Sequence, residues 1–399
     1  MGISLFTVGG LLPDMARDLL PGQWAANSAS AIGSVGWVVT AFTLGAVVGA
    51  PVLAATTGRL PRKWLLLGLV AVFVVSSVLV AVLPSFGLIV AARFINGVPF
   101  GVYLSTAVLV AAGIMTPSHR GRGIAVVGAG PTVAVLVGAP LGTSMGQLLG
   151  WRVVFLVIAV IFALAFVAIA LALPYSPGDP VASFQQELVA LRLPQVWLAI
   201  LFGVLGFGGM FAVITYIAPI STTVTGIPSS AIPLVQFALG AGMTLGALTS
   251  GWLADRSVSR VLLGFVVGMT LSLAGFAIFA SSVVGLLLFT SLIGLFNAGS
   301  ATATQIRMID IARDSRALGA ALNQSALGLG NSLGAFLGGL AIAAGFGYLA
   351  PAVVGATLST LGVIIVVIAL TVGRVQQLGR WPSLQPGTYH PATCESSPT

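Results

Sequence analysis

The feature that most constrains this chain is a succession of apolar segments about 20 residues long, separated by short polar, Pro-rich or Gly-rich breaks. A helix of about 20 residues crosses the ~30 Å hydrocarbon core of a bilayer. Inside lipid every backbone amide and carbonyl needs a partner within the chain, and these continuous runs lack the alternation of barrel strands. We therefore predict an all-α integral membrane protein with twelve transmembrane helices, over residues 1–13, 35–56, 64–83, 87–114, 122–149, 152–173, 196–219, 231–254, 261–279, 283–305, 317–344 and 348–372.

The composition agrees with this class of protein. Hydrophobic residues make up 58% of the chain, and the mean hydropathy is +1.11, more than the polar surface of a water-soluble domain could cover. The formal net charge of +8 would suit a nucleic-acid partner in a soluble protein. The positions of the bases decide between these two explanations of the charge.

The bases are distributed unequally between alternate loops. One set of loops and ends contains Arg59, Arg62, Lys63, Arg120, Arg122, Arg192, Arg256, Arg260, Arg307, Arg313, Arg316, Arg374 and Arg380. The opposite set contains Arg17 and Arg152. Because bases near helix ends are retained in the cytoplasm, we place the first set there, together with both termini. We expect a cell-membrane protein whose bases attract anionic membrane lipid, with no nucleic-acid partner.

The first apolar segment is short for a membrane span. About twelve apolar residues precede Pro13, roughly half of what a span needs. Residues 1–12 contain no base, so a cleaved signal peptide is not indicated. We expect that the start codon was assigned late, or the chain truncated, and that about ten residues of a full span are missing.

The longest polar break between predicted helices divides them into six and six. We predict an N-terminal six-helix bundle at 1–173, a cytoplasmic linker at 174–195, a C-terminal six-helix bundle at 196–372 and a disordered cytoplasmic tail at 373–399.

Two pairs of residues indicate that the halves are an internal repeat. Arg59 and Arg256 each follow the second helix of a half, about 200 positions apart. Asn96 and Asn297 lie in the fourth helix of each half at a similar separation. Such a duplication is typical of secondary transporters.

Residues Gly251, Leu253, Ala254, Asp255, Arg256 and Arg260 resemble the motif G-x-L-A-D-R-x-x-x-R of the major facilitator superfamily. The segment ARFINGVPFG, which contains Arg93 and Asn96, is similar to the fourth-helix motif of that family, with Asn96 in place of the usual Gln. The segment VGAPLGT at 137–143 resembles a weakened fifth-helix antiporter motif. The resemblance covers nearly the whole chain and is closest to bacterial drug:proton antiporters of the chloramphenicol-resistance and arabinose-efflux-like branch.

This resemblance implies a conformational latch at the cytoplasmic end of the eighth helix. Gly251, Asp255, Arg256 and Arg260 would belong to it, with Arg59 in the earlier copy of the motif. A carboxylate at Asp255 can accept bonds from the free amides at the start of another helix. Gly58 stands at the equivalent place in the first half, so the latch would be one-sided. The alternative is that these charges only set the topology.

The fourth helix carries a base inside the membrane, which is costly unless that base faces water, a carbonyl or an acid. Arg93, Asn96, Phe100 and Tyr103 recur at helical spacing, so we expect this face to line a central cavity. The alternative is that Arg93 extends to an interface or bonds helix-end carbonyls. Further candidates for substrate binding are Tyr216, Gln236, Asn297, Asn323 and Gln324. Each of these groups could instead join two helices by a hydrogen bond.

Small residues four apart allow helix backbones to approach closely. The fifth and eleventh helices carry Gly138, Pro140, Gly142, Gly146, Gly330, Gly334 and Gly338. The resemblance places these helices between the two halves, where we expect smooth faces to slide or rock. Ordinary static packing is the alternative.

A proton carrier is not obvious, because no acid or histidine lies in the middle of a predicted span. Asp14 is the best carboxylate, and the alternative is that it is a solvated loop charge. The two histidines are isolated and Cys394 is the sole cysteine, so we expect no enzyme, no cofactor and no metal site.

The sequence thus predicts a monomeric secondary transporter in a bacterial plasma membrane that exports a small, largely apolar drug or metabolite by alternating access. Protons are the coupling partner implied by the resemblance. A sugar or nucleoside facilitator or importer, or a membrane sensor without transport, are the alternatives.

Overall fold

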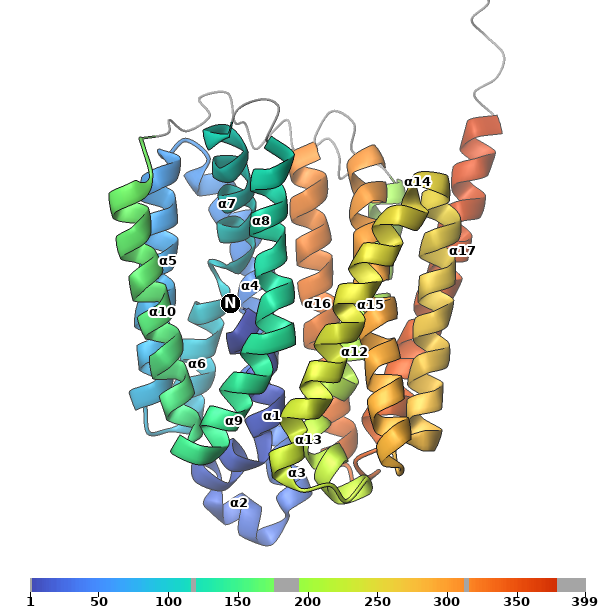
Figure 1. Ribbon diagram of the computed structural model, residues 1–399. Helices are drawn as coiled ribbons and strands as arrows, with labels where there is room; N and C mark the ends of the chain where they lie inside the picture. Colours follow the sequence, from blue (N-terminus) through green and yellow to red (C-terminus); the bar gives the residue numbers. More distant parts are fainter. Residues whose placement is uncertain (1, 116–119, 176–193, 312–315, 379–399) are drawn as a thin grey trace, which may run out of the picture.

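The computed structural model describes residues 2–115, 120–175, 194–311 and 316–378, and every regular element in these ranges is helical (Figure 1). The first half contains α1 (Gly2–Leu19), α2 (Pro21–Ala26), α3 (Ser28–Val35), α4 (Trp37–Thr57), α5 (Arg62–Val82), α6 (Phe86–Gly97), α7 (Phe100–Ile114), α8 (Arg120–Val133), the π-helix η1 (Ala134–Gly138), α9 (Ala139–Leu149) and α10 (Trp151–Ala172).

The second half repeats this arrangement after the linker, most of which lies outside the described ranges. It contains α12 (Pro194–Ile214), α13 (Ile217–Pro219), the π-helix η3 (Ile220–Val224), the short η4 (Ser229–Ala231), α14 (Ile232–Phe279), α15 (Val283–Ile311), α16 (Arg316–Ala343) and α17 (Ala350–Leu378). Within the described ranges ten helices are long and apolar enough to cross a membrane, or eleven if one bent pair counts as a span. The prediction of an all-helical membrane protein is confirmed.

The first predicted span is the one that differs most from the structure. The helix does not end at Pro13 but continues to Leu19, and its last part carries Asp14, Arg17 and Asp18. Proline removes one backbone hydrogen bond from a helix. Leu12 and Met15 are fully buried on either side of Pro13, so side-chain packing holds the helix across the missing bond. The three charges explain why α1 is not among the helices apolar enough to span a bilayer.

The seventh predicted span is broken. A bend of 50° separates residues 200–214 from 217–224. Pro219 has no N–H to bond the carbonyl of Thr215, four residues earlier, and a proline in this position bends helices. The eighth and ninth predicted spans form one helical tract, α14, which is interrupted at Ser257 by extended backbone (φ −170°, ψ 100°).

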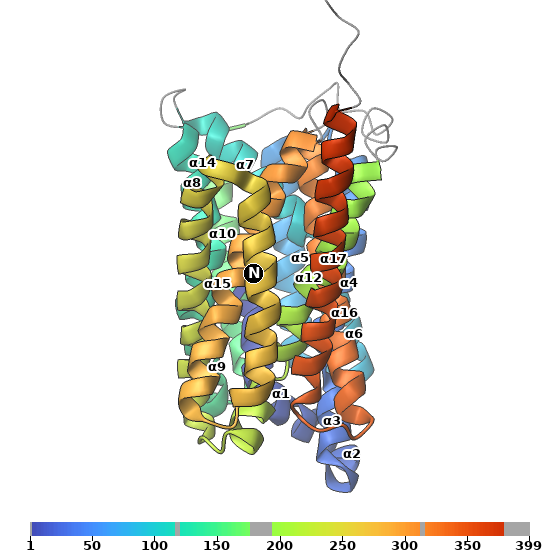
Figure 2. The same cartoon turned by 90° about the vertical axis from the view of Figure 1, so that its right-hand side faces the viewer.

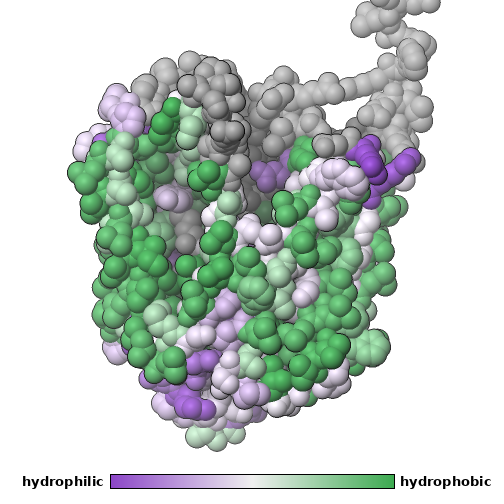
Figure 3. Space-filling model, in the orientation of Figure 1, coloured by the Kyte–Doolittle hydropathy of each residue, from purple (hydrophilic) through white to green (hydrophobic). Residues whose placement is uncertain are grey.

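The helices form two groups that run side by side (Figures 1 and 2). Within each group the same pairs are in contact: α4 packs on α6 as α14 packs on α15, and α1 packs on α9 as α12 packs on α16. The seam between the groups is made by α3 and α4 against α16, and by η1 and α9 against α14. Apolar side chains cover the middle of the face seen in Figure 3, as contact with lipid requires.

The predicted glycine stripes lie on helices of the seam but do not face across it. A methyl group at Gly138, Gly142 or Gly146 would meet Ile3, Thr7 and Leu11 of α1, respectively. A methyl group at Gly330, Gly334 or Gly338 would meet the backbone of α12 at Gly203, Gly208 and Ala212. Both stripes therefore pack inside their own half, and the expectation that they form sliding faces between the halves is wrong for this structure. The closest backbone approaches lie within each half, where a side chain would not fit.

Pro140 stands in the first turn of α9, directly after the π-helix η1. It cannot donate to the carbonyl of Leu136, and the wider turn of η1 accommodates the missing bond. Pro140 therefore shapes the part of the fifth helix that packs on α14 at the seam.

We predict that Gly334→Ala destabilises the protein and Gly264→Ala does not. The new methyl group at 334 would overlap the carbonyl oxygen of Gly208, which costs about 1–3 kcal/mol. At 264 nothing lies within 4 Å, and alanine is favoured over glycine in a helix by about 1 kcal/mol. The apparent unfolding temperature in detergent measures both changes. Equal unfolding temperatures for the two variants would contradict the assigned packing of α16 on α12.

Candidate functional site

Arg93 is the centre of a buried polar network in the first half. Its guanidinium has no exposed surface and donates to three groups from two other helices and its own: the Ser4 hydroxyl at 2.7 Å, the Val38 carbonyl at 3.2 Å and the Asn96 side-chain oxygen at 3.4 Å. A further N–H reaches the Ser4 carbonyl at 3.2 Å. All of these partners are neutral. The network therefore joins α1, α4 and α6 around one positive charge.

Aromatic rings complete the surroundings of this charge. The guanidinium carbon lies 4.6 Å from the centre of the Phe42 ring and 5.5 Å from that of Phe155. Ring faces attract cations, so they offset part of the cost of burial. Asn96 continues the network by donating to the hydroxyls of Ser76 and Ser77 at 2.7 and 3.3 Å. The network thus extends from α6 to α5.

The fourth-helix face expected to line a cavity instead faces the core of the first half. Arg93 and Asn96 are 0% and 2% exposed. Phe100 packs edge-on against Phe42, and Tyr103 packs edge-on against Phe73, with ring centres 5.7 and 5.9 Å apart. The predicted helical spacing is interrupted, because α6 ends at Gly97 and α7 begins at Phe100. The aromatic pairs of α7 continue the inward packing of α6. The prediction that this face lines a central cavity is therefore wrong for this structure. A role of Arg93 in coupling stays a prediction.

The seam carries its own set of polar contacts. Gln236 of α14 donates to the Phe6 carbonyl of α1 at 3.2 Å. Ser332 of α16 donates to the Thr43 hydroxyl of α4 at 2.6 Å. Ring pairs cross the seam as well, Phe6 with Phe211 at 5.6 Å and Trp37 with Phe336 at 5.3 Å. These contacts lie between the middle of the helices and the end that carries α2.

Two further contacts close the seam near its α2 end. Gln147 at the end of α9 donates to the Ser229 carbonyl at 2.9 Å. Tyr348, in the loop before α17, is hydrogen-bonded to Ser28. Partial burial raises the pKa of Tyr348, and this hydrogen bond opposes the shift. The loops of both halves thus meet at this end.

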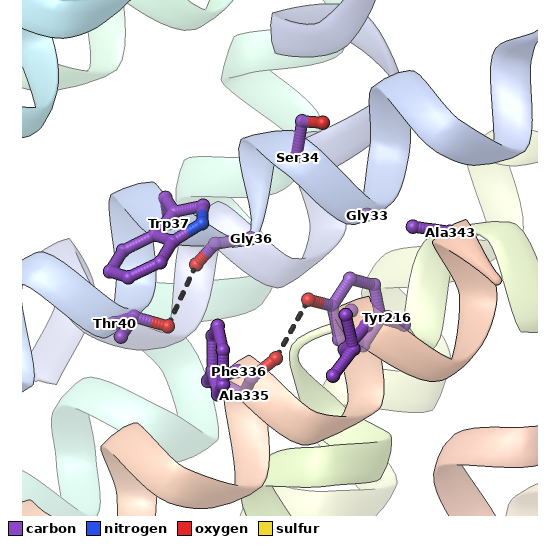
Figure 4. A pocket seen from close by; sticks show the side chains of 11 residues that line it. Gly33, Ser34, Gly36, Trp37, Thr40, Tyr216, Ala335, Phe336 and Ala343 are labelled. Atoms are coloured by element: carbon purple, nitrogen blue, oxygen red, sulfur yellow. Dashed lines mark hydrogen bonds between the residues drawn. The ribbon is translucent and has the colours of Figure 1, made fainter.

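Tyr216 lies behind a cavity of about 180 Å³ in the seam (Figure 4). The cavity is lined by Gly33, Ser34, Gly36, Trp37, Thr40, Tyr216, Ala335, Phe336, Gly339, Leu340 and Ala343. The Tyr216 hydroxyl donates to the Ala335 carbonyl at 2.8 Å, so its polar group is already satisfied by α16. Gly36 and Gly339 flank this hydroxyl so closely that a methyl group at either position would overlap it. The ring of Tyr216 therefore fills the space between α4 and α16.

The residues of the predicted latch and those predicted to bind substrate are only partly described. The side chains of Asp255, Asn323 and Gln324 lie outside the described part of the structure. Arg59, Arg256 and Arg260 are exposed, and Arg256 lies 4.5 Å from the centre of the Trp252 ring. Gly251 has open space beside it. The latch and a binding role for the buried Asn297 of α15 stay predictions.

The acids of α1 occupy different surroundings. Asp14 is partly buried. Asp18, one turn later, accepts a hydrogen bond from the Trp151 indole at 3.0 Å and pairs with Arg152. Sequence reasoning missed Asp18, although Arg152 was one of only two bases assigned to the outer loops and an acid within reach could have been sought. In the described ranges no group of three His, Cys, Asp or Glu side chains could hold a metal ion.

The family model described as Major Facilitator Superfamily matches residues 1–257 and 217–386. The inner membrane transport protein YdhP of Escherichia coli strain K12 is 29% identical over 366 residues, 92% of each chain. The chloramphenicol resistance protein of Streptomyces lividans is 34% identical over 266 residues, 66% of each chain. The transcription regulatory protein OpdE of Pseudomonas aeruginosa is 30% identical over 279 residues, 68% of this chain and 65% of that one.

Among solved structures, the nucleoside transporter NupG superposes with a TM-score of 0.71 at 15% sequence identity, covering 92% of this chain and 97% of NupG. At this identity the likeness concerns the fold alone.

We predict that Arg93→Lys lowers stability while Arg256→Lys does not. A lysine at 93 keeps the buried charge but cannot reach Ser4, Val38 and Asn96 together, because its ammonium lacks the rigid fork of the guanidinium. The lost bonds correspond to about 1–3 kcal/mol. Arg256 is exposed, so its exchange should stay within about 0.5 kcal/mol. Thermal unfolding in detergent compares the two variants, and an unchanged midpoint for Arg93→Lys would show that the network does not stabilise the fold.

Proposed function

Because the chain belongs to the Major Facilitator Superfamily and is a multi-pass secondary transporter rather than an enzyme, we propose that it exports a small, largely apolar drug or metabolite by alternating access, with protons moving inward. The proposed setting is the bacterial inner membrane, with both termini in the cytoplasm and the protein acting as a monomer.

The observation that carries this proposal is the uneven seam. Hydrogen bonds and ring pairs hold the two halves together from the level of Phe6 to the loops around Gln147 and Tyr348. At the opposite end fewer contacts join the halves, namely α7 with α16 and α8 with α14, and the described bases Arg59 and Arg256 are exposed. Two rigid groups joined on one side are what one state of an alternating-access cycle requires.

The charge distribution supports an orientation for this state. The exposed bases belong to the loops that the positive-inside rule assigns to the cytoplasm. The sealed end is then the outer end, and the open end faces the cytoplasm. In the complementary state Asp255 would hold the cytoplasmic ends together as the proposed latch.

The proposal of a largely apolar substrate is supported by the side chains that meet at the seam around Phe6. Phe6 and Phe211 contribute aromatic surface, and Gln236 contributes an amide. Such a surface suits a compound with a large apolar body and few polar groups. The name of the Streptomyces relative, a chloramphenicol resistance protein, points to the same kind of cargo.

A second candidate function is a membrane sensor without net transport. The relative OpdE, which matches 68% of this chain, is named a transcription regulatory protein. A sensor would use the same two states but would bind its ligand without carrying it across. Flux measurements separate these functions.

The test of export uses chloramphenicol as the probe, in cells lacking the gene and in cells overproducing the intact chain. We expect overproduction to lower the steady accumulation of labelled chloramphenicol at least twofold, and a protonophore to abolish the difference. Higher accumulation in the overproducing cells would favour an importer. Saturable binding to the purified protein without flux in liposomes would favour the sensor.

We further predict that Asp14→Asn abolishes proton-driven exchange in liposomes, while Asp18→Asn retains it. An amide cannot carry a proton, and Asp14 is the proposed carrier. Asp18 already pairs with Arg152 and Trp151 near the surface, where an ion pair is worth about 0.2–1 kcal/mol. Substrate-linked pH change inside the liposomes is the measurement. Full exchange by Asp14→Asn would exclude this residue as the carrier.

A further inference from the structure

The cavity in front of Tyr216 is made by both halves of the protein (Figure 4). Five of its eleven lining residues lie in the first half, between Gly33 and Thr40, and the other six lie in the second half. The halves are in backbone contact beside it, because a methyl group at Gly33 would be 2.6 Å from the Gly339 carbonyl oxygen. The cavity therefore has this form only while the two halves are together on the α2 side.

The volume of the cavity suits one small ring. It is about 180 Å³, and an apolar cavity of about 150 Å³ is enough to hold one benzene molecule. Along α16 the lining runs from Ala335 to Ala343, a distance of about 12 Å at the helical rise per residue. Pockets for drug-sized compounds are larger, about 300–1,000 Å³. The cavity is therefore too small to be the site of a cargo such as chloramphenicol.

The hydroxyl groups of the lining are already bonded within the protein. The hydroxyls of Tyr216 and Thr40 donate to backbone carbonyls at 2.8 and 3.3 Å. The Ser34 hydroxyl accepts a hydrogen bond from the Gln23 amide at 3.0 Å. Apart from the indole of Trp37, the other side chains of the lining carry no polar atom. The lining favours an apolar ligand, since a polar one would lose its bonds to water on entry.

Aromatic side chains of the two halves meet in the wall of the cavity. The rings of Trp37 and Phe336 have their centres 5.3 Å apart and are inclined at 62°, an edge-to-face arrangement. Ring pairs of this kind are stabilised beyond their burial of apolar surface. A further ring in the cavity can pack against both of them. The wall therefore favours an aromatic ring over a linear acyl chain.

The mouth of the cavity lies at the surface that faces lipid. Trp37 and Leu340 are 43% and 54% exposed. Both residues belong to helices that are long and apolar enough to cross a membrane, so their exposed surface contacts lipid. In the orientation proposed above, this end of the seam lies in the outer half of the bilayer. A ligand dissolved there reaches the cavity without entering the transport route.

We propose that the cavity is a binding site for a single-ring aromatic hydrocarbon, which enters from the outer leaflet and holds the two halves together. Such a ligand contacts both halves, so it binds the sealed state in preference to the open one and opposes opening. Binding depends on the cavity alone. The effect on opening rests on the alternating-access part of the proposed function, and not on the cargo or on proton coupling.

The first experiment measures binding of fluorobenzene to the purified full chain in detergent, from the saturable change of its ¹⁹F NMR signal. Ala343→Leu puts a larger apolar side chain into the lining, and we expect it to abolish saturable binding. Ala344→Leu is the matched control, because it makes the same change at the next position, which is also exposed but outside the lining. Its affinity should stay within about twofold of the unchanged chain.

A second variant decides if Ala343→Leu is misfolded by size-exclusion chromatography. Phe336→Leu keeps an apolar side chain in the wall but removes one ring, which should weaken binding about two- to tenfold. Absence of saturable binding to the unchanged chain, or equal binding by Ala343→Leu, would overturn the proposal. Displacement of fluorobenzene by dodecane at a lower concentration than by toluene would also overturn it, since the site would then prefer a lipid chain.

The second experiment measures the effect on opening in liposomes. Ser332→Cys, in the full chain with Cys394→Ser, places a thiol on the seam opposite Thr43, at a position that is 4% exposed in the sealed state. At ten times its Kd, toluene should slow labelling of this thiol by an impermeant maleimide about tenfold. The same labelling with Ala343→Leu added corrects for any effect of toluene on the bilayer. Saturable binding without slower labelling would refute the coupling to opening, and failure of the export assay would leave the binding result intact.

Discussion

Helix association in this protein depends on backbones that approach one another where glycine replaces a side chain. In lipid there is no hydrophobic drive between helices, so dispersion and close contact hold them together. The contacts of Gly334 with Gly208 and of Gly45 with Phe94 bring a methyl position within overlapping distance of a carbonyl oxygen. These contacts lie inside each half. Backbones also approach across the seam, as at Gly9 with Ile214 and at Gly33 with Gly339, but less closely than inside the halves.

The difference between these two kinds of packing decides which part of the molecule can move. Within a half, a displacement of α16 from α12 would separate a long row of backbone contacts. At the seam, a displacement exchanges a few hydrogen bonds, such as those of Gln236 and Ser332, for bonds with water. Water bonds are nearly as favourable as the ones they replace. The hydrogen bonds of the seam can thus be exchanged for bonds with water, while the closest backbone contacts favour keeping each half intact.

Arg93 is a buried charge that joins the helices of the first half to one another. Its bonds to α1 and α4 and its contacts with the rings of Phe42 and Phe155 connect four helices of the first half: α1, α4, α6 and α10. A buried charge without an acid is costly in a membrane. The cost is offset by bonds to several neutral groups at once, which only the guanidinium fork can make. Its place in the core follows from this requirement for many partners.

The sequence by itself determined the class of protein, because the length and apolar content of each segment decide whether that segment can cross a bilayer. It also determined the family, through residues such as Asp255 and Arg256 that lie close together in the chain. Only the tertiary structure decided which neighbour each face meets: the glycines of α9 and α16 face inward, Arg93 is enclosed, and α1 continues through Pro13. Helical periodicity shows which residues share a face of a helix but not what that face contacts. In a membrane the faces that contact lipid and the faces that contact other helices are both apolar. The pairing of helices distant in the chain settles that question.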